Sequence, residues 1–196
     1  MAEKTAALDD PIIRSALRSK LLLDHSNVDG AVLLEELGLC RGRVRVDLAV
    51  VNGQMHGYEI KSDCDRLSRL DVQAEIYAKV FDRVTLVVGD RHLEQGVVAV
   101  PAWWGVLHAR HSAGGLRFSP VRRSKKNPNR DPRSLVELLW LDGAIRLLEE
   151  HAAVRGMRGK PRRIVWDRIC DHLGIDEISA AVRTQLKARA ANQCLA

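Results

Sequence analysis

The sequence has few cysteines and no long hydrophobic run, and each scarcity excludes a class of protein. Its 4 cysteines show no CxxC spacing, so we expect free thiols and neither a zinc ribbon nor a disulfide framework. No stretch approaches the roughly 18 uninterrupted apolar residues of a membrane-spanning helix. The charged segment from Met1 to Asp10 also lacks the apolar run of a signal peptide. These absences predict a cytoplasmic protein without a membrane partner.

What is present is typical of a globular protein with an uneven charge. The chain has 196 residues, of which 46% are hydrophobic and 29% charged, enough for one domain with a helical appendage. Residues 1–100 hold 13 basic and 16 acidic residues, whereas residues 101–196 hold 18 basic and 9 acidic ones. This asymmetry favours a polyanionic partner that touches the second half, the alternative being that the charge serves solubility alone.

Periodicity and turn signals predict an α/β core followed by a basic helical tail. Predicted strands, rich in β-branched residues, cover 32–39, 43–51, 58–61, 84–88, 97–100, 105–109 and 116–121. Predicted helices, with apolar residues at helical spacing, cover 11–23, 66–81, 134–151, 163–173 and 175–190. We therefore expect a core at residues 1–121, a basic linker at 122–133 and a helical extension at 134–196.

Three charged residues of the core stand where strands are otherwise apolar. Glu59 and Lys61 are two positions apart and share one face of a strand, and Asp47 lies on the preceding strand. Burying these charges costs free energy unless they compensate one another and a bound cation compensates the carboxylates. Two carboxylates near one point suit a hard divalent ion such as Mg²⁺, and the lysine could hold an attacking water and offset phosphoryl charge. A surface salt bridge is the alternative.

Asp47 followed by Glu59-Ile60-Lys61 resembles the signature of the PD-(D/E)XK nuclease superfamily. Gln73 and Tyr77 are similar to the QxxxY pattern of its RecB-like members. The resemblance implies a restriction-endonuclease-like fold, a central mixed sheet flanked by helices. It implies Mg²⁺ or Mn²⁺ as cofactor and catalytic roles for these five residues. Val46 departs from the family, which has proline before the aspartate.

Two further resemblances extend this interpretation. Glu36 occupies the place of an additional upstream acidic ligand, although a solvated charge is the alternative for it. The Trp103-Trp104-Gly105 segment and the helical tail resemble a bacterial family of poorly characterised PD-(D/E)XK-like proteins.

The turn between the two strands of the motif provides an internal test. A strict two-residue loop at Asn52-Gly53 would pair Asp47 with Tyr58 and place Glu59 on the opposite face of the sheet. The metal-site hypothesis therefore predicts an odd-numbered loop, such as residues 52–54 with Asp47 opposite Glu59, or a bulge.

Together these features predict a metal-dependent endo- or exodeoxyribonuclease, and the resemblance implies a setting in DNA repair, restriction or phage defence. RNA is not excluded as a substrate, and a homodimer is compatible with the sequence. Alternatives are a catalytically inactive nucleic-acid-binding module or an interaction subunit of a larger complex. Basic residues expected to contact phosphates, unless they only solvate their segments, are Arg66, Arg69, Arg122, Arg123, Lys125, Lys126, Lys160, Arg162 and Arg163.

Overall fold

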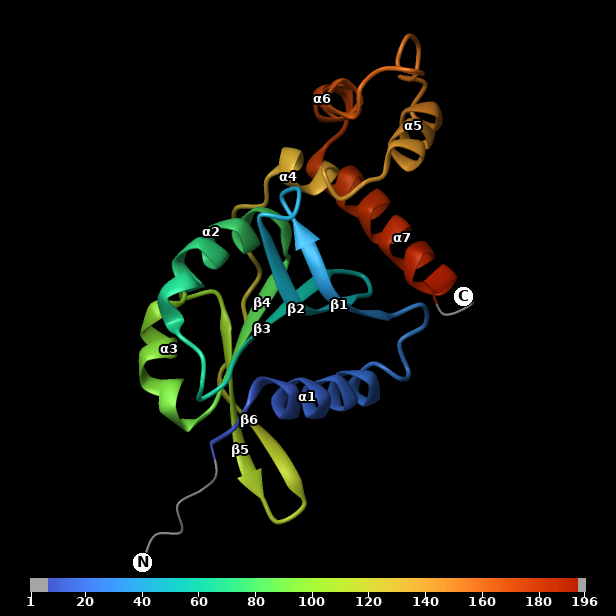
Figure 1. The fold of residues 1–196 in the computed structure, drawn as a ribbon. Helices are drawn as coiled ribbons and strands as arrows, with labels where there is room; N and C mark the ends of the chain where they lie inside the picture. The colour runs from blue at the N-terminus through green and yellow to red at the C-terminus, as the bar shows by residue number, and fades with distance from the viewer. Residues whose placement is uncertain (1–6, 194–196) are drawn as a thin grey trace, which may run out of the picture.

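The computed structural model describes residues 7–193, which form a mixed α/β fold around a six-stranded sheet (Figure 1). The strands are β1 (Val32–Leu39), β2 (Val44–Val51), β3 (Met55–Lys61), β4 (Arg83–Val88), β5 (Gly105–Ser112) and β6 (Gly115–Arg122). The helices are α1 (Asp10–Asp24), α2 (Leu70–Val80), α3 (Leu93–Ala99), α4 (Pro132–Val136), α5 (Leu141–Glu150), α6 (Arg162–His172) and α7 (Ile175–Gln193). Short 3-10 turns η1 (Leu67–Arg69) and η2 (Asp90–His92) precede α2 and α3.

The strands lie in the order β1-β2-β3-β4-β5-β6, which makes the sheet mixed. β1, β2 and β3 are antiparallel neighbours, as are β5 and β6, whereas β4 runs parallel to both β3 and β5. The parallel pairs require crossovers, which α2 and α3 provide. The predicted fold class, a mixed sheet flanked by helices with a C-terminal helical region, is confirmed.

Helices cover both faces of the sheet (Figure 1). α1 begins after Asp9, whose side chain accepts the Ile12 N–H, and Pro11 stands in its first turn, as expected of a helix start. The buried side of α1 packs with Leu48, Val50, Tyr58 and Ile60 on one face. α2 packs against the other face, with Val51 and Val84 in its cluster. The site residues of β2 and β3 therefore lie between two layers of helices.

An apolar cluster connects the C-terminal helices to the sheet. One apolar cluster runs from Leu39 and Tyr77 in the α/β part to Trp166 and Ile178 in α6 and α7. The segment 122–133, expected as a linker, is anchored between them. Its buried Asn127 donates to the carbonyls of Ala78 and Phe81 at 2.6 and 2.7 Å, which caps the end of α2.

Two predictions of local structure are wrong. Residues 97–100, predicted as a strand, belong largely to α3, because Gly96 lets this helix lie against Leu86 and Val88 of β4. Residues 134–151, predicted as one helix, are α4 and α5 separated at Trp140, whose N–H donates to the side-chain carbonyl of Gln185. Tertiary contacts override local pattern at both places. Within residues 7–193 no helix is long and apolar enough to cross a membrane.

Candidate active site

The turn between β2 and β3 has the odd length that the metal-site hypothesis requires. Val51 pairs with Met55, so residues 52–54 form a three-residue loop, and the prediction is confirmed. Asn52 closes this loop: its N–H donates to the Gln54 carbonyl, and its side-chain oxygen accepts the Gln54 N–H, both at 3.0 Å. Continued in this register, Asp47 stands opposite Glu59.

The Asp47 side chain lies where the β2–β3 ladder ends. The last backbone pair of the ladder joins Leu48 and Tyr58. Beyond it, Asp47 Oδ2 accepts the backbone N–H of Ile60 at 2.7 Å. The two strands thus separate around this carboxylate, which keeps the buried Ile60 N–H satisfied and holds Asp47 beside Glu59.

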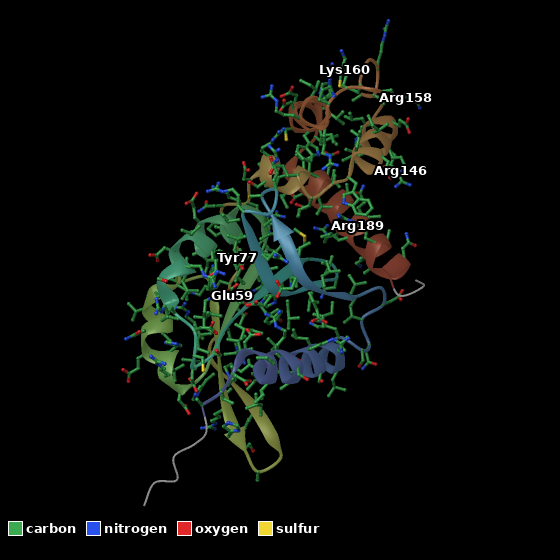
Figure 2. The ribbon with its side chains drawn as sticks, viewed as in Figure 1. Glu59, Tyr77, Arg146, Arg158, Lys160 and Arg189 are labelled. Atoms are coloured by element: carbon green, nitrogen blue, oxygen red, sulfur yellow. The ribbon has the colours of Figure 1, made fainter. Side chains whose placement is uncertain are left out.

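Glu59 is the centre of a buried hydrogen-bond network. It is 2% exposed, and Lys61 Nζ lies 2.6 Å from its Oε1. Gln73 Nε2 donates to Oε1 and the Tyr77 hydroxyl donates to Oε2, both at 2.5 Å. Figure 2 shows Glu59 and Tyr77 next to each other, from β3 and α2. Four of the five side chains singled out in the sequence therefore make direct contact.

Helix α2 orients this network because Gln73 and Tyr77 lie about one turn apart on its buried side. The Tyr77 ring stacks on Trp104 at 5.7 Å between centroids, and it meets Phe81 edge to face. Burial, followed by the charge of Glu59, raises the pKa of the Tyr77 hydroxyl. The hydroxyl is thus a fixed neutral donor that holds the Glu59 carboxylate in one orientation.

These side chains face a cavity of about 640 Å³. Asp47, Glu59, Lys61 and Gln73 all line it, together with the side of the β1–β2 turn that carries Arg43. Two buried polar groups of this lining have unused hydrogen-bonding capacity. Lys61 has one hydrogen-bond partner among the described residues, so two of its three donors are unused. The buried Gln73 Oε1 has no partner within residues 7–193 either.

Burial and the nearby charge of Glu59 raise the pKa of Asp47 to about 6. Burial is the largest cause and the charge of Glu59 is the second. The Ile60 N–H and Arg14 lower the pKa but do not cancel these effects. A further cation in this cavity would therefore be favourable.

Arg14 is the site residue that the sequence did not indicate. Its guanidinium, from α1, bonds Asp47 Oδ1 at 2.7 Å, Glu36 Oε1 at 2.8 Å and Asp10 Oδ1 at 3.0 Å. The sequence predicted the helix, but nothing in it indicated that Arg14 faces Asp47 across the sheet. Glu36 lines the cavity with its side chain about half exposed, and its backbone φ is +51°.

The predicted basic residues fall into different places. Arg69 lines the cavity, whereas Arg66 does not, although both are exposed. Arg122 is a structural residue, because its guanidinium donates to the carbonyls of Trp104 at 2.7 Å and Pro101 at 3.1 Å, with weaker bonds to two others. It is therefore not free to contact phosphate. Exposed residues outside this cavity are Arg123, Lys125, Lys126, Lys160, Arg162 and Arg163.

A family comparison covers nearly the whole chain: residues 3–195 match the family described as bacteriophage P4 protein cII. The chain belongs to this family. Protein cII of Enterobacteria phage P4 is 30% identical over 95 residues, which are 48% of this chain and 36% of that protein. The match thus spans about a third of the relative's length.

A solved structure, a protein of unknown function from Silicibacter pomeroyi, is similar with a TM-score of 0.42 and 23% identity. The similarity covers 76% of this chain and 92% of that one. At these values it says nothing about chemistry.

Proposed function

We propose that the chain is a metal-dependent nuclease that hydrolyses phosphodiester bonds of DNA at the cavity around Asp47, Glu59 and Lys61. The observation that carries the proposal is the direct network of Glu59 with Lys61, Gln73 and Tyr77, beside Asp47. Such a network is costly to bury, because desolvating each charge takes several kcal/mol in principle. A fold that needed only stability could fill this space with apolar residues.

The donor set of the cavity fits Mg²⁺ or Mn²⁺. Within residues 7–193 no group of three or more His, Cys, Asp or Glu side chains is arranged to hold a metal ion. Mg²⁺, however, commonly takes one or two protein carboxylates and keeps water or substrate phosphate as its other ligands. Asp47 and Glu59 supply two, and the unpartnered Gln73 Oε1 could accept from a bound water. Glu36, further out, is a candidate for an additional contact.

When bound, the ion would polarise the phosphate and lower the pKa of a coordinated water. The chain itself supplies the remaining functions. The unused Lys61 donors hold the attacking water and offset the negative charge that develops on the phosphoryl oxygens. Tyr77 and Gln73 act through Glu59, since they hold its carboxylate in place. In the hydrolysis a P–O bond forms from water while a P–O ester bond breaks.

One observation favours a second candidate, a nucleic-acid-binding module without catalysis. The Arg14 guanidinium bonds Asp47 Oδ1 and so supplies the positive charge that a metal ion would otherwise bring. If Arg14 never leaves Asp47, the carboxylates serve the fold and the basic surfaces serve binding alone.

The experiment that separates the two candidates measures cleavage of linear, nicked and single-stranded DNA with Mn²⁺. We expect Asp47→Asn and Lys61→Ala to lower the rate at least about a hundredfold. Asp47→Asn conserves shape and guards against misfolding. Lys79→Ala, which removes a surface lysine of α2 paired with Glu75, is the matched control. Equal rates for all four proteins, or no cleavage by the unsubstituted chain while it binds DNA, would overturn the nuclease proposal.

A further inference from the structure

A second cavity, of about 260 Å³, is lined by residues of the β1–β2 turn and of the C-terminal helices α4 and α6. We call it the arginine pocket. It is lined by Arg41, Arg133, Arg162, Arg163 and Trp166. Arg41 comes from the turn, Arg133 from α4, and the others from α6. Three separate segments of the chain thus bring four guanidinium groups around one small space.

The positive charge of the arginine pocket is not balanced within the described residues. Arg133 has carboxylate partners, Asp167 at 2.5 Å and Glu137 at 3.5 Å. In the part of the chain that the structure describes, no carboxylate lies within ion-pair distance of Arg41, Arg162 or Arg163, all of which are exposed. The pocket is therefore suited to an external anion.

The position of two of these arginines on α6 points the same way. Arg162 and Arg163 are the first residues of an 11-residue helix that has no acidic residue in its first turn and no side-chain cap. The start of a helix carries a partial positive charge and unpaired N–H groups, so cations there are unfavourable and anions favourable. An anion bound at this point would relieve the repulsion and accept the free backbone donors.

Trp166 holds the guanidinium groups in place. Arg133 lies 5.2 Å and Arg162 5.5 Å from the centroid of its ring, which is 4% exposed and packed in the core. Cation–π contact fixes the planar groups without using their N–H donors. The donors of Arg162 stay available for the bidentate bonds that guanidinium makes with phosphate, whereas Arg133 is already paired with Asp167 and Glu137.

The arginine pocket adjoins the carboxylate cavity through one turn. Gly42 and Arg43 line the carboxylate cavity, and Arg41 lines the arginine pocket. Consecutive residues of one turn therefore line the two spaces. Left-handed φ angles of Cys40, Arg41 and Gly42 bend the backbone there and send successive side chains in different directions.

From these observations we propose that the arginine pocket binds phosphate groups of a DNA strand whose continuation lies at the carboxylate cavity. The inference rests on the proposed function and adds to it a second contact, on the C-terminal helices. A chain of phosphates can reach both spaces, whereas a single small anion reaches one. Contacts of this kind are to the backbone and carry no sequence preference.

The test measures binding of a fluorescein-labelled DNA duplex of about 20 base pairs by fluorescence anisotropy, in EDTA, over a range of salt concentrations. We expect the double variant Arg162→Ala, Arg163→Ala to bind between about tenfold and fiftyfold more weakly at 0.1 M salt. The slope of log K against log salt should fall in magnitude by about two.

The matched control is the double variant Arg146→Ala, Arg155→Ala, which removes the same charge from the same helical region at exposed residues outside both spaces. It should keep the affinity and the slope within about twofold. Equal losses in both double variants, no loss in Arg162→Ala, Arg163→Ala, or no DNA binding by the unsubstituted chain would each overturn the inference.

Because binding is measured in EDTA, its outcome is separate from cleavage. Arginine-dependent binding without any Mn²⁺-dependent cleavage would remove the nuclease proposal and leave the arginine pocket as part of a binding module. Cleavage with Mn²⁺, together with unchanged binding by Arg162→Ala, Arg163→Ala, would overturn the inference about the arginine pocket and leave the nuclease proposal standing.

Discussion

The carboxylate cavity and the arginine pocket are lined by consecutive residues of one turn but differ in how their charges are balanced. At the cavity, Arg14 pairs with Asp10, Glu36 and Asp47, and Lys61 pairs with Glu59, so acidic and basic side chains balance one another. In the arginine pocket, guanidinium groups outnumber their acidic partners. Paired charges within the fold fix the positions of their side chains, whereas unpaired charges are available to an external ligand.

The largest effect should come from removing the centre of the paired network. Glu59→Ala leaves Lys61 buried without a counter-charge and Tyr77 without its acceptor, which should lower the free energy of unfolding by about 3–5 kcal/mol. Urea denaturation measures this. Glu75→Ala, which removes an exposed partner of Lys79, should leave the free energy of unfolding unchanged within the error of the measurement. A Glu59→Ala protein as stable as the control would mean that the network is not balanced as described.

The second effect concerns the raised pKa of Asp47, which is caused first by burial and then by the charge of Glu59. The pKa of Asp47 is raised to about 6 in the folded chain from 3.8, so the folded state binds the proton more tightly than the unfolded state. The contribution of Asp47 to stability is therefore full below about pH 4 and is lost as the pH rises to about 6. Asp47→Asn should be more stable than the unsubstituted chain by about 1–3 kcal/mol above pH 6.

Denaturation in EDTA between pH 4 and pH 8 checks this expectation. The advantage of Asp47→Asn should vanish toward the acid end of the range. An advantage that is constant with pH, or a less stable variant at pH 7, would show that Arg14 balances Asp47 fully and that no cation is needed there.

A third effect tests whether Arg14 competes with a metal ion. Arg14→Gln removes the guanidinium from Asp47 Oδ1, so Mn²⁺ should bind about tenfold more tightly by isothermal titration calorimetry, or about 1.4 kcal/mol. Arg18→Gln is the control, since Arg18 lies one turn further along α1 and pairs with Glu35 outside the cavity. Weaker Mn²⁺ binding by Arg14→Gln would instead make Arg14 part of the metal site.

The smallest expected effect concerns Arg69 and Arg66, two exposed arginines that precede α2. Arg69 lines the carboxylate cavity and Arg66, three residues earlier, does not. Arg69→Ala should weaken duplex binding by about threefold to tenfold, the value of one phosphate contact, whereas Arg66→Ala should have little effect. Equal effects of the two variants on anisotropy would mean that DNA does not reach the cavity mouth at α2.

The sequence indicated which motif residues come together, because the pairing register of the strands restricts which side chains can meet. Periodicity places Glu59 with Lys61, and Gln73 with Tyr77, on one face each, and the resemblance to the nuclease motif groups the two pairs. An odd loop or a bulge was needed to bring Asp47 to them. That loop and these contacts are present. The catalytic roles of these residues stay predictions, as does the metal ion.

The sequence was silent where distant segments decide the outcome. Arg14 contacts Asp47 because of how α1 crosses the sheet, and Arg122 is used by carbonyls of the segment before β5. Neither placement follows from local spacing. The arginine pocket depends likewise on the packing of α6 against the β1–β2 turn, so the sequence indicated Arg162 and Arg163 but not their partners Arg41 and Trp166.

The clamp of Asn127 on the end of α2 has a consequence for any attempt to shorten the molecule. A fragment that stopped at Val121 would lose this amide and the α6 and α7 side chains that continue the apolar cluster of Leu39 and Tyr77. The helix that orients Glu59 would then end in bare carbonyl groups beside an uncovered core. The chain therefore cannot be truncated at the change in charge near residue 122 without loss of stability. We expect deletion or replacement of residues 122–196 to destabilise the α/β part as well.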